Sequence, residues 1–221
     1  MESDEHRAED SMAEGTEMMD FSEYPKRFEL NDGSEVFLRP MRRDDRDRLH
    51  VFFKELPARD RRYFKHDVTQ REVITNWCKN LDYDQVLPIL AVVREDDHER
   101  VVADATLHTE RHGWATHVAR IRTVIRPKLR KKGLGEILLR ELYDRAVLRG
   151  IQKIQAEVRE DNSNAISLLK RLGFKREAVF KKHAMDQQGK LHDVIIFYND
   201  LSDLWKKMDD MNIDYDFCMV P

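Results

Sequence analysis

A short loop rich in glycine and basic residues constrains the fold of this chain most strongly. The loop spans residues 130–135, reads RKKGLG, and lies between an apolar strand-like segment ending at Ile125 and an amphipathic helix. Glycines at this spacing let the backbone turn tightly and approach a ligand closely. The N–H groups that begin the helix, together with the helix dipole, favour an anion. The sequence therefore predicts a strand–loop–helix unit that binds a diphosphate.

Two common phosphate-binding motifs are absent from this loop. No Gly-Lys-Ser/Thr follows it, so it is not a Walker loop, and it lacks the third glycine of the dinucleotide fingerprint. A basic surface loop around a glycine turn fits the same residues. The loop alone leaves both interpretations open.

Hydrophobic periodicity predicts the remaining elements. Apolar residues make up 41% of the 221 residues, which is enough for a folded core. Strands are expected at 27–30, 35–39, 86–94, 100–108, 117–125, 153–159, 174–185 and 190–198. Helices are expected at 42–54, 57–63, 69–79, 133–149, 162–172 and 201–211. Helices that separate the later strands predict an α/β fold (α+β mixed sheet) with a central mixed sheet flanked by helices.

Charge is distributed unevenly along the chain. Residues 1–24 contain nine acidic residues and one arginine, and they show no sustained apolar period. This composition predicts a disordered acidic tail. The folded domain is expected over 26–205, followed by a C-terminal extension over 206–221.

Several classes of protein are disfavoured by the composition. The longest apolar run, 86–93, is eight residues, whereas a membrane helix needs roughly 20. The start of the chain does not resemble a secretory signal, and Cys78 and Cys218 form no disulfide or metal pattern. The net charge of −3 gives no basic stripe for nucleic acid. We therefore expect a cytoplasmic protein that binds neither membrane nor nucleic acid, and no metal site at the histidines His108, His112 and His117.

Three motifs in order resemble the GNAT superfamily of N-acetyltransferases. They are TVIRP at 123–127 with the loop at 130–135, EVREDN at 157–162, and LGF at 172–174. The second half is most similar to the ribosomal-protein alanine N-acetyltransferases. The resemblance covers 119–197 strongly and 34–110 moderately, and it implies a GNAT-like fold and the use of acetyl-CoA.

The resemblance also implies which residues bind acetyl-CoA. The backbone of one strand would pair with the pantetheine arm, the N–H groups of the loop would hold the diphosphate, and an asparagine would lie near the thioester. The asparagine also fits a helix cap. The implied residues are Thr123, Val124, Ile125, Arg130, Lys131, Lys132, Gly133, Leu134, Gly135, Glu136 and Asn162.

The catalytic residues follow the family pattern only in part. Acetyl transfer to an amine needs a group that removes a proton from the ammonium, and Glu157 matches the base position. The alternation of its strand also fits a solvated face. Leu169 stands where the family often has a proton-donating tyrosine, so His183 on the next strand is a substitute candidate.

The sequence therefore predicts an acetyl-CoA-dependent N-acetyltransferase that acts on a primary amine. A non-catalytic acyl-CoA-binding or regulatory module is the alternative, which Leu169 keeps open. The acceptor is undetermined among a protein lysine, a protein N-terminus, an amino acid and a polyamine. Homodimer formation is likewise left open.

Overall fold

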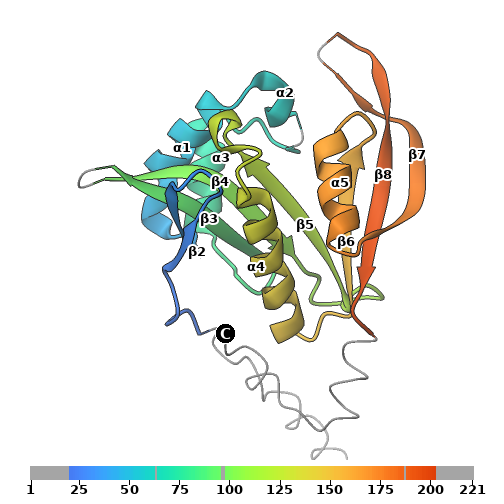
Figure 1. Ribbon diagram of the computed structural model, residues 1–221, viewed down its shortest axis with the longest axis horizontal. Helices are drawn as coiled ribbons and strands as arrows, with labels where there is room; N and C mark the ends of the chain where they lie inside the picture. Colours follow the sequence, from blue (N-terminus) through green and yellow to red (C-terminus); the bar gives the residue numbers. More distant parts are fainter. Residues whose placement is uncertain (1–19, 63, 96–97, 187, 203–221) are drawn as a thin grey trace, which may run out of the picture.

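A single eight-stranded sheet forms the centre of the protein (Figure 1). The computed structural model describes residues 20–62, 64–95, 98–186 and 188–202. The strands are β1 (Lys26–Glu29), β2 (Glu35–Pro40), β3 (Val86–Glu95), β4 (His98–His108), β5 (Val118–Ile125), β6 (Lys153–Arg159), β7 (Lys175–Met185) and β8 (Leu191–Asp200). The α-helices are α1 (Arg46–Glu55), α2 (Ala58–Arg61), α3 (Arg71–Lys79), α4 (Leu134–Leu148) and α5 (Ser163–Arg171).

The sheet is mixed, as the sequence predicts. Its strand order is β1-β2-β3-β4-β5-β6-β8-β7, and every neighbouring pair is antiparallel except β5 and β6. Helix α4 connects this parallel pair, which is the usual role of a helix between parallel strands. The predicted helix over 201–211 lies almost entirely outside the described residues, as do residues 1–19 and the extension 206–221.

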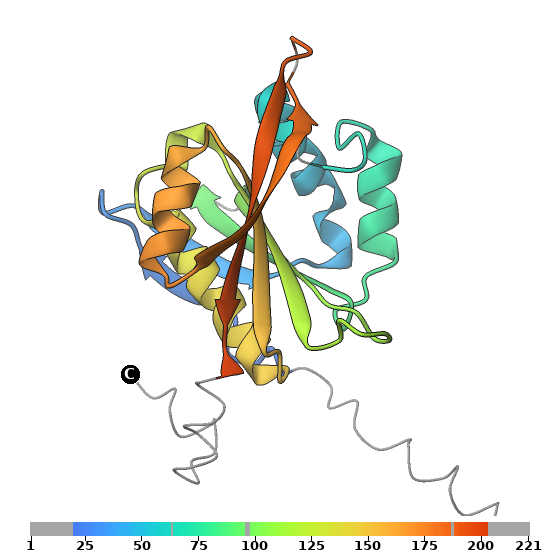
Figure 2. The same ribbon diagram turned by 90° about the vertical axis from the view of Figure 1, so that its right-hand side faces the viewer.

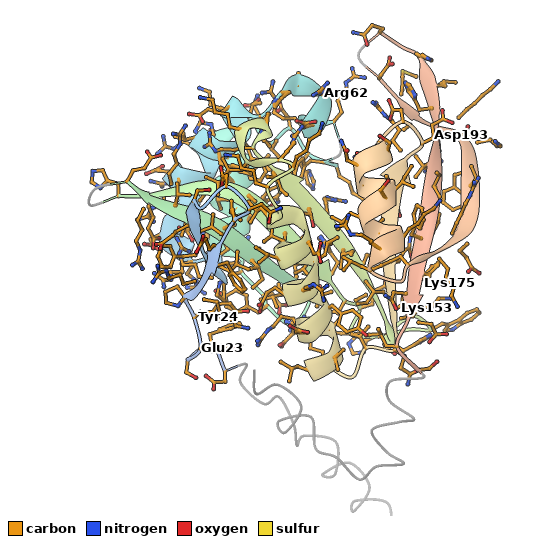
Figure 3. All side chains as sticks on the ribbon, in the orientation of Figure 1. Glu23, Tyr24, Arg62, Lys153, Lys175 and Asp193 are labelled. Carbon is orange, nitrogen blue, oxygen red and sulfur yellow. The ribbon has the colours of Figure 1, made fainter. Side chains whose placement is uncertain are left out.

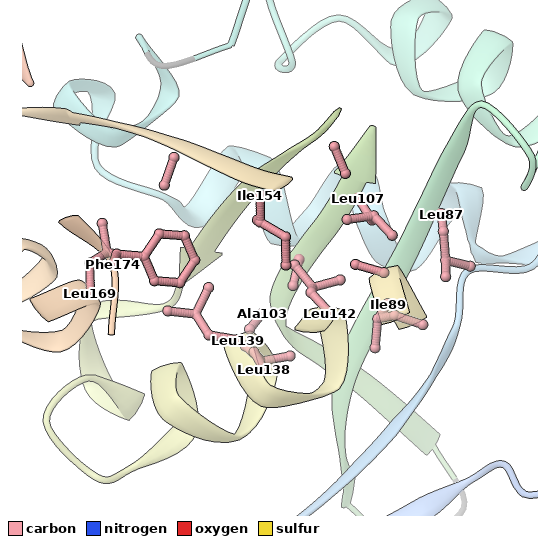
Figure 4. Packing of buried hydrophobic residues seen from close by; sticks show 14 of the residues in the cluster. Leu87, Ile89, Ala103, Leu107, Leu138, Leu139, Leu142, Ile154, Leu169 and Phe174 are labelled. Carbon is pink, nitrogen blue, oxygen red and sulfur yellow. The ribbon is translucent and has the colours of Figure 1, made fainter. Parts of the chain in front are cut away.

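Helices cover both faces of the sheet (Figure 2). Helices α1 and α3 lie on one side, and α4 and α5 lie on the other. Each side has its own apolar cluster. Figure 4 shows the α4 and α5 side, where Leu138 and Leu142 of α4 pack with Ile89 and Leu107 of the sheet. Phe52 and Phe53 of α1 form the centre of the cluster on the other side. None of the described helices has the length and apolar character needed to cross a bilayer.

Residues 20–24 pack against the domain, so the predicted boundary of the acidic tail at residue 24 is wrong. The Phe21 ring lies 5.1 Å from the Tyr83 ring in an edge contact, and the Tyr24 hydroxyl donates to the Glu141 carboxylate of α4. Figure 3 shows Glu23 and Tyr24 near the lower end of α4, where Glu23 pairs with Arg145. The two aromatic rings anchor a segment whose acidic composition suggested a tail.

Candidate functional site

The two halves of the sheet are joined through a short parallel pairing. Strand β5 pairs with β6 over only four positions, from Val118 with Lys153 to Ile121 with Ala156. Beyond these positions the strands diverge toward their C-terminal ends (Figure 1). Because β5 remains paired with β4 as far as Ile125, only the edge of β5 that faces β6 becomes free. The final residues of β5 therefore present unused backbone groups to the space between the strands.

The loop after β5 has an unusual backbone. Lys131 has φ of 61° and Gly133 has φ of 90°, so two of its residues are left-handed. The turn between β1 and β2 holds the loop in place. The Asn31 N–H donates to the Lys132 carbonyl at 3.0 Å, and the Lys132 ammonium pairs with Asp32 at 2.6 Å. This conformation directs successive N–H groups outward, as in other anion-binding loops.

Most N–H groups of the loop are free. In the described part of the chain, no oxygen accepts a hydrogen bond from the N–H groups of Lys131, Lys132, Gly133, Leu134 or Gly135. The N–H of Glu136 differs from them, because it donates to the Gly133 carbonyl at 2.9 Å in the first turn of α4. Free donors at the start of a 15-residue helix favour an anion.

Arg130 holds the loop to the helices on the other side of the sheet. Its guanidinium donates to Asp60 of α2 at 2.5 Å and to the Ile125 carbonyl at 2.9 Å. Glu136, which would repel an anion, is paired with Arg140 at 3.0 Å and with Arg171 at 2.7 Å. The charge at the start of α4 is therefore positive, because the single acidic residue of the first turn is neutralised.

Gly135 has a packing role in addition to the expected one. A Cβ atom on Gly135 would lie 3.2 Å from the Leu168 side chain of α5 and 3.5 Å from Ile125. The missing side chain therefore allows α4 to approach α5 closely. A larger residue at this position would disturb that packing, so a substitution of Gly133 tests the loop more cleanly.

Two further residues of the expected cofactor site lie beside the loop and the free edge. The hydroxyl oxygen of Thr123 is buried and has no hydrogen-bond partner in the described part of the chain. Asn162 caps α5, since its side-chain oxygen accepts from the Ala165 N–H at 3.3 Å. The cap orients Asn162 at the C-terminal end of β6, where β6 has parted from β5.

Glu157 is the first residue of β6 beyond the parallel pairing. Its side chain is exposed, while its neighbours Ala156 and Val158 belong to the core under α4 and α5. The amide of Gln155 donates to the Glu157 carboxylate at 3.1 Å, and the hydroxyl of Tyr198 donates to Gln155 at 2.8 Å. This chain of hydrogen bonds orients Glu157 on the sheet face that carries α1 and α3.

His183 and Leu169 do not join this group. His183 lies on the edge strand β7 and contacts the Phe180 ring at 5.2 Å. Because β8 separates β7 from β6, His183 is at least two strand spacings, about 10 Å, from Glu157. Leu169 is 3% exposed and packs in the core near Phe174 (Figure 4). Neither residue is placed to donate a proton beside Glu157.

The tip of the β7–β8 hairpin touches the helices on the opposite side of the strand gap. The Arg62 guanidinium lies just after α2 (Figure 3). It donates to the carbonyls of Met185 and Asp186. The Met185 contact is 3.1 Å. The hairpin and the segment after α2 therefore border the space above the free ends of β5 and β6.

Sequence reasoning missed one buried carboxylic acid on the same face as Glu157. Asp104 of β4 is 7% exposed, and its Oδ1 has no hydrogen-bond partner among the described residues. Burial raises the pKa of Asp104 to about 7, although the nearby Arg122 lowers it. The signal was present in the sequence, because Asp104, Thr106 and His108 alternate with Ala103, Ala105 and Leu107 in the second half of the strand.

The imidazole of His108 belongs to the same polar row. It lies 3.0 Å from the Thr106 hydroxyl. Burial, followed by the charges of Arg122, Arg120 and Lys65, lowers the pKa of His108 to about 4. His108 is therefore neutral at pH 7. No group of three potential metal ligands occurs within the described ranges.

The comparisons with known proteins agree with this geometry. A model of the acetyltransferase (GNAT) family matches residues 50–174, so the chain belongs to this family. A [ribosomal protein bS18]-alanine N-acetyltransferase of Salmonella typhimurium is 35% identical over 63 residues. That match covers 28% of this chain and 43% of the relative, so the chain spans less than half of that protein.

Solved structures of the same family share the fold. An acetyltransferase from Streptococcus pneumoniae is 20% identical with a TM-score of 0.61, over 74% of this chain and 98% of the other. The GNAT domain of S. lividans PAT is 17% identical with a TM-score of 0.64, over 80% and 96%. A ribosomal-protein-alanine N-acetyltransferase from Brucella melitensis is 19% identical with a TM-score of 0.61, over 74% and 99%. The resemblance and fold class predicted from the sequence are confirmed.

Proposed function

We propose that this protein is an acetyl-CoA-dependent N-acetyltransferase that acetylates a primary amine. The observation that carries the proposal is the row of free N–H groups at 131–135, which follows the free edge of β5 along the chain. A diphosphate fits the first, and an extended arm with amide groups fits the second. The unpartnered hydroxyl of Thr123 offers a further polar contact to such a ligand. Acetyl-CoA would supply the activated acetyl group.

The proposed roles of the protein's own residues follow from this placement. The residues Lys131, Lys132, Gly133, Leu134 and Gly135 bind the diphosphate through backbone N–H groups. The edge formed by Thr123, Val124 and Ile125 aligns the extended arm toward the point where β5 and β6 meet. Positioning of the two reactants supplies much of the rate in such reactions. Glu157, at that point, receives the proton that the acceptor ammonium must lose before its nitrogen can attack.

A cytoplasmic location is part of the proposal. The Salmonella relative is named for its action on a ribosomal protein, and ribosomes are cytoplasmic. The acceptor of this chain is a separate question, since the match to that relative covers only part of both proteins.

The cofactor site can be tested by a pair of glycine variants. Gly133→Ala places a Cβ 3.0 Å from the Asn31 side-chain oxygen at a residue with φ of 90°, so the loop must shift. Gly113→Ala introduces a similar strain at φ of 100° in the β4–β5 loop, with no atom within 4 Å of the new Cβ. We expect at least a ~10-fold weaker acetyl-CoA affinity by calorimetry for Gly133→Ala only, or about 1.4 kcal/mol. Equal affinities in both folded variants would place the cofactor elsewhere.

A test of Glu157 distinguishes an enzyme from a non-catalytic acyl-CoA-binding module. The buried Leu169, which cannot donate a proton, favours the non-catalytic module. Glu157→Gln should reduce turnover by about 10²–10⁴-fold, the usual contribution of a general base, and leave acetyl-CoA affinity unchanged. Glu177→Gln, at an exposed glutamate on the edge strand β7, is the matched control. Acetyl-CoA binding without any turnover on a broad panel of amines would favour the non-catalytic module.

A further inference from the structure

The unpaired carboxylic acid of Asp104 needs a physical explanation. Neither of its oxygens accepts a hydrogen bond from any described residue, and the residue is 7% exposed. Buried polar groups in folded proteins are almost always hydrogen-bonded, because leaving one unpaired costs about 1–3 kcal/mol. Such a group is commonly retained for function rather than for stability.

The surroundings of Asp104 are apolar. In the sheet register Asp104 lies between Leu90 of β3 and Val124 of β5. Both neighbours belong to the apolar cluster under α1 and α3, to which Phe64 also contributes. A carboxylate with apolar walls is complementary to an alkylammonium group, whose methylene chain contacts the walls while its charge pairs with the acid.

The charged group nearest to Asp104 leaves it unpaired. Arg122 of β5 is diagonal to Asp104 in the register, and its guanidinium lies 5.6 Å from the centre of the Phe64 ring. Arg122 lowers the pKa of Asp104 without forming an ion pair with it. A cation supplied by a ligand would therefore be the direct partner of Asp104.

The strand register also indicates which part of the acceptor would carry this cation. Asp104 stands on β4, β5 is its neighbour, and the gap toward β6 lies on the far side of β5. About one and a half strand spacings, roughly 7 Å, separate the Asp104 backbone from the line of that gap. The reacting nitrogen must lie within roughly 3.5 Å of the thioester in the gap. Asp104 is therefore placed to contact a part of the acceptor that is several bonds from the reacting nitrogen.

We propose that Asp104 binds a second, protonated nitrogen of the acceptor. The acceptor class is then a molecule with two amino groups joined by a short apolar spacer. A free diamine or polyamine has this chemistry, and so does a peptide with a lysine beside its reacting amine. This inference rests on the proposed acetyltransferase function and narrows its substrate.

The test compares two amines of equal length on the full chain saturated with coenzyme A. We expect calorimetry to show that 1,4-diaminobutane binds at least ~10-fold more tightly than pentylamine, in which a methyl group replaces one ammonium. Asp104→Asn should remove this preference, as should Asp104→Leu, while acetyl-CoA affinity stays unchanged in both. A second pair, the peptides Ala-Lys-Ala-Ala and Ala-Ala-Ala-Ala, distinguishes a free diamine from a peptide acceptor. If the acceptor is a peptide, the affinity ratio should be larger for the peptide pair than for the amine pair.

Two results would overturn the inference. One is an equal affinity of the wild type for the paired ligands in both pairs. The other is a preference that survives in Asp104→Asn. Failure of the proposed function is distinct, because it would show as absent acetyl-CoA binding in the wild type before any amine is added.

Discussion

Two aspartates are buried on the α1 and α3 side of the sheet, and they differ in their hydrogen-bond partners and in the direction of their pKa shifts. Asp45, before α1, is fully buried and accepts hydrogen bonds from the Arg39 guanidinium at 2.6 and 2.7 Å and from the Arg42 N–H at 2.7 Å. Asp104 accepts none from the described residues. Burial would raise the pKa of Asp45, but the bonds from Arg39 and Arg42 hold it below its usual value. Burial dominates at Asp104 and raises its pKa to about 7.

The difference separates a structural acid from a functional one. Asp45 joins β2 to the start of α1, because its partner Arg39 lies on β2 and is itself 1% exposed. Asp104 joins no two elements, and its carboxyl faces the side of the sheet where Glu157 marks the end of the strand pairing. A buried acid with a full set of partners stabilises the fold, whereas one without partners destabilises it until a ligand arrives.

The largest change in the free energy of unfolding is expected when Asp45, the structural acid, loses its charge. Asp45→Asn leaves the buried Arg39 with only Glu99 as an ionic partner. Removing one member of a buried ion pair costs about 3–5 kcal/mol. Urea denaturation should show this loss in the free energy of unfolding. A loss below about 1 kcal/mol would mean that Asp45 does not stabilise the fold, although it is buried and fully hydrogen-bonded.

A smaller loss is expected at a third buried acid, Glu141 of α4. Glu141 is 3% exposed and is bonded by Tyr24, by Lys26 at 3.0 Å and by Arg145 at 3.1 Å. Deleting residues 1–24 removes Tyr24 and the packing of Phe21, so Glu141 becomes more like Asp104. We expect a loss of about 2–3 kcal/mol, since a buried hydrogen bond to a charged group contributes about 1.5–3 kcal/mol.

Deletion of residues 1–19 is the matched control for that experiment. It removes most of the acidic residues of the segment but retains Phe21, Glu23 and Tyr24. Its melting temperature should stay close to that of the full chain. Equal losses in the two deletions would show that the contacts of residues 20–24 do not stabilise the domain.

The smallest change in the free energy of unfolding is expected for Asp104→Asn, and it is a gain in stability rather than a loss. Asp104→Asn should stabilise the protein by about 1–2 kcal/mol at pH 8, because it removes an unpaired buried charge. The folded state holds a proton on Asp104 up to about pH 7, whereas the unfolded chain releases it near pH 4. The stability of the wild type should therefore fall as pH rises from 4 to 7.

The gain from Asp104→Asn should accordingly be larger at pH 8 than at pH 5, as measured by thermal unfolding without ligand. Destabilisation at both pH values would contradict the account, because it would show that Asp104 has a stabilising partner in solution.

The sequence predicted those parts of the site that depend on local chemistry. The glycines and lysines of the loop at 130–135 specify a tight turn before a helix, and Asn162 specifies a helix cap, so both could be recognised from neighbouring residues alone. The family motifs added the GNAT-like fold. Leu169, which the sequence marks as a departure from the family pattern, is a core residue in the structure.

Features that depend on distant contacts were not predictable. The early end of the β5–β6 pairing depends on how far two strands separated by α4 stay in register. The packing of Gly135 depends on Leu168 of α5, and the docking of Phe21 depends on Tyr83. The missing partners of Asp104 could be known only once every neighbouring side chain was placed.

We propose that the free N–H groups of the loop and of the β5 edge bind acetyl-CoA. Hydrogen exchange of the backbone amides, measured with and without saturating acetyl-CoA, tests this binding. We predict slower exchange at Lys131, Lys132, Gly133, Leu134 and Gly135 and within 122–125, while the amide of Glu136 changes less because it is already hydrogen-bonded. Unchanged exchange at 131–135, with acetyl-CoA bound and protection appearing elsewhere, would contradict the account.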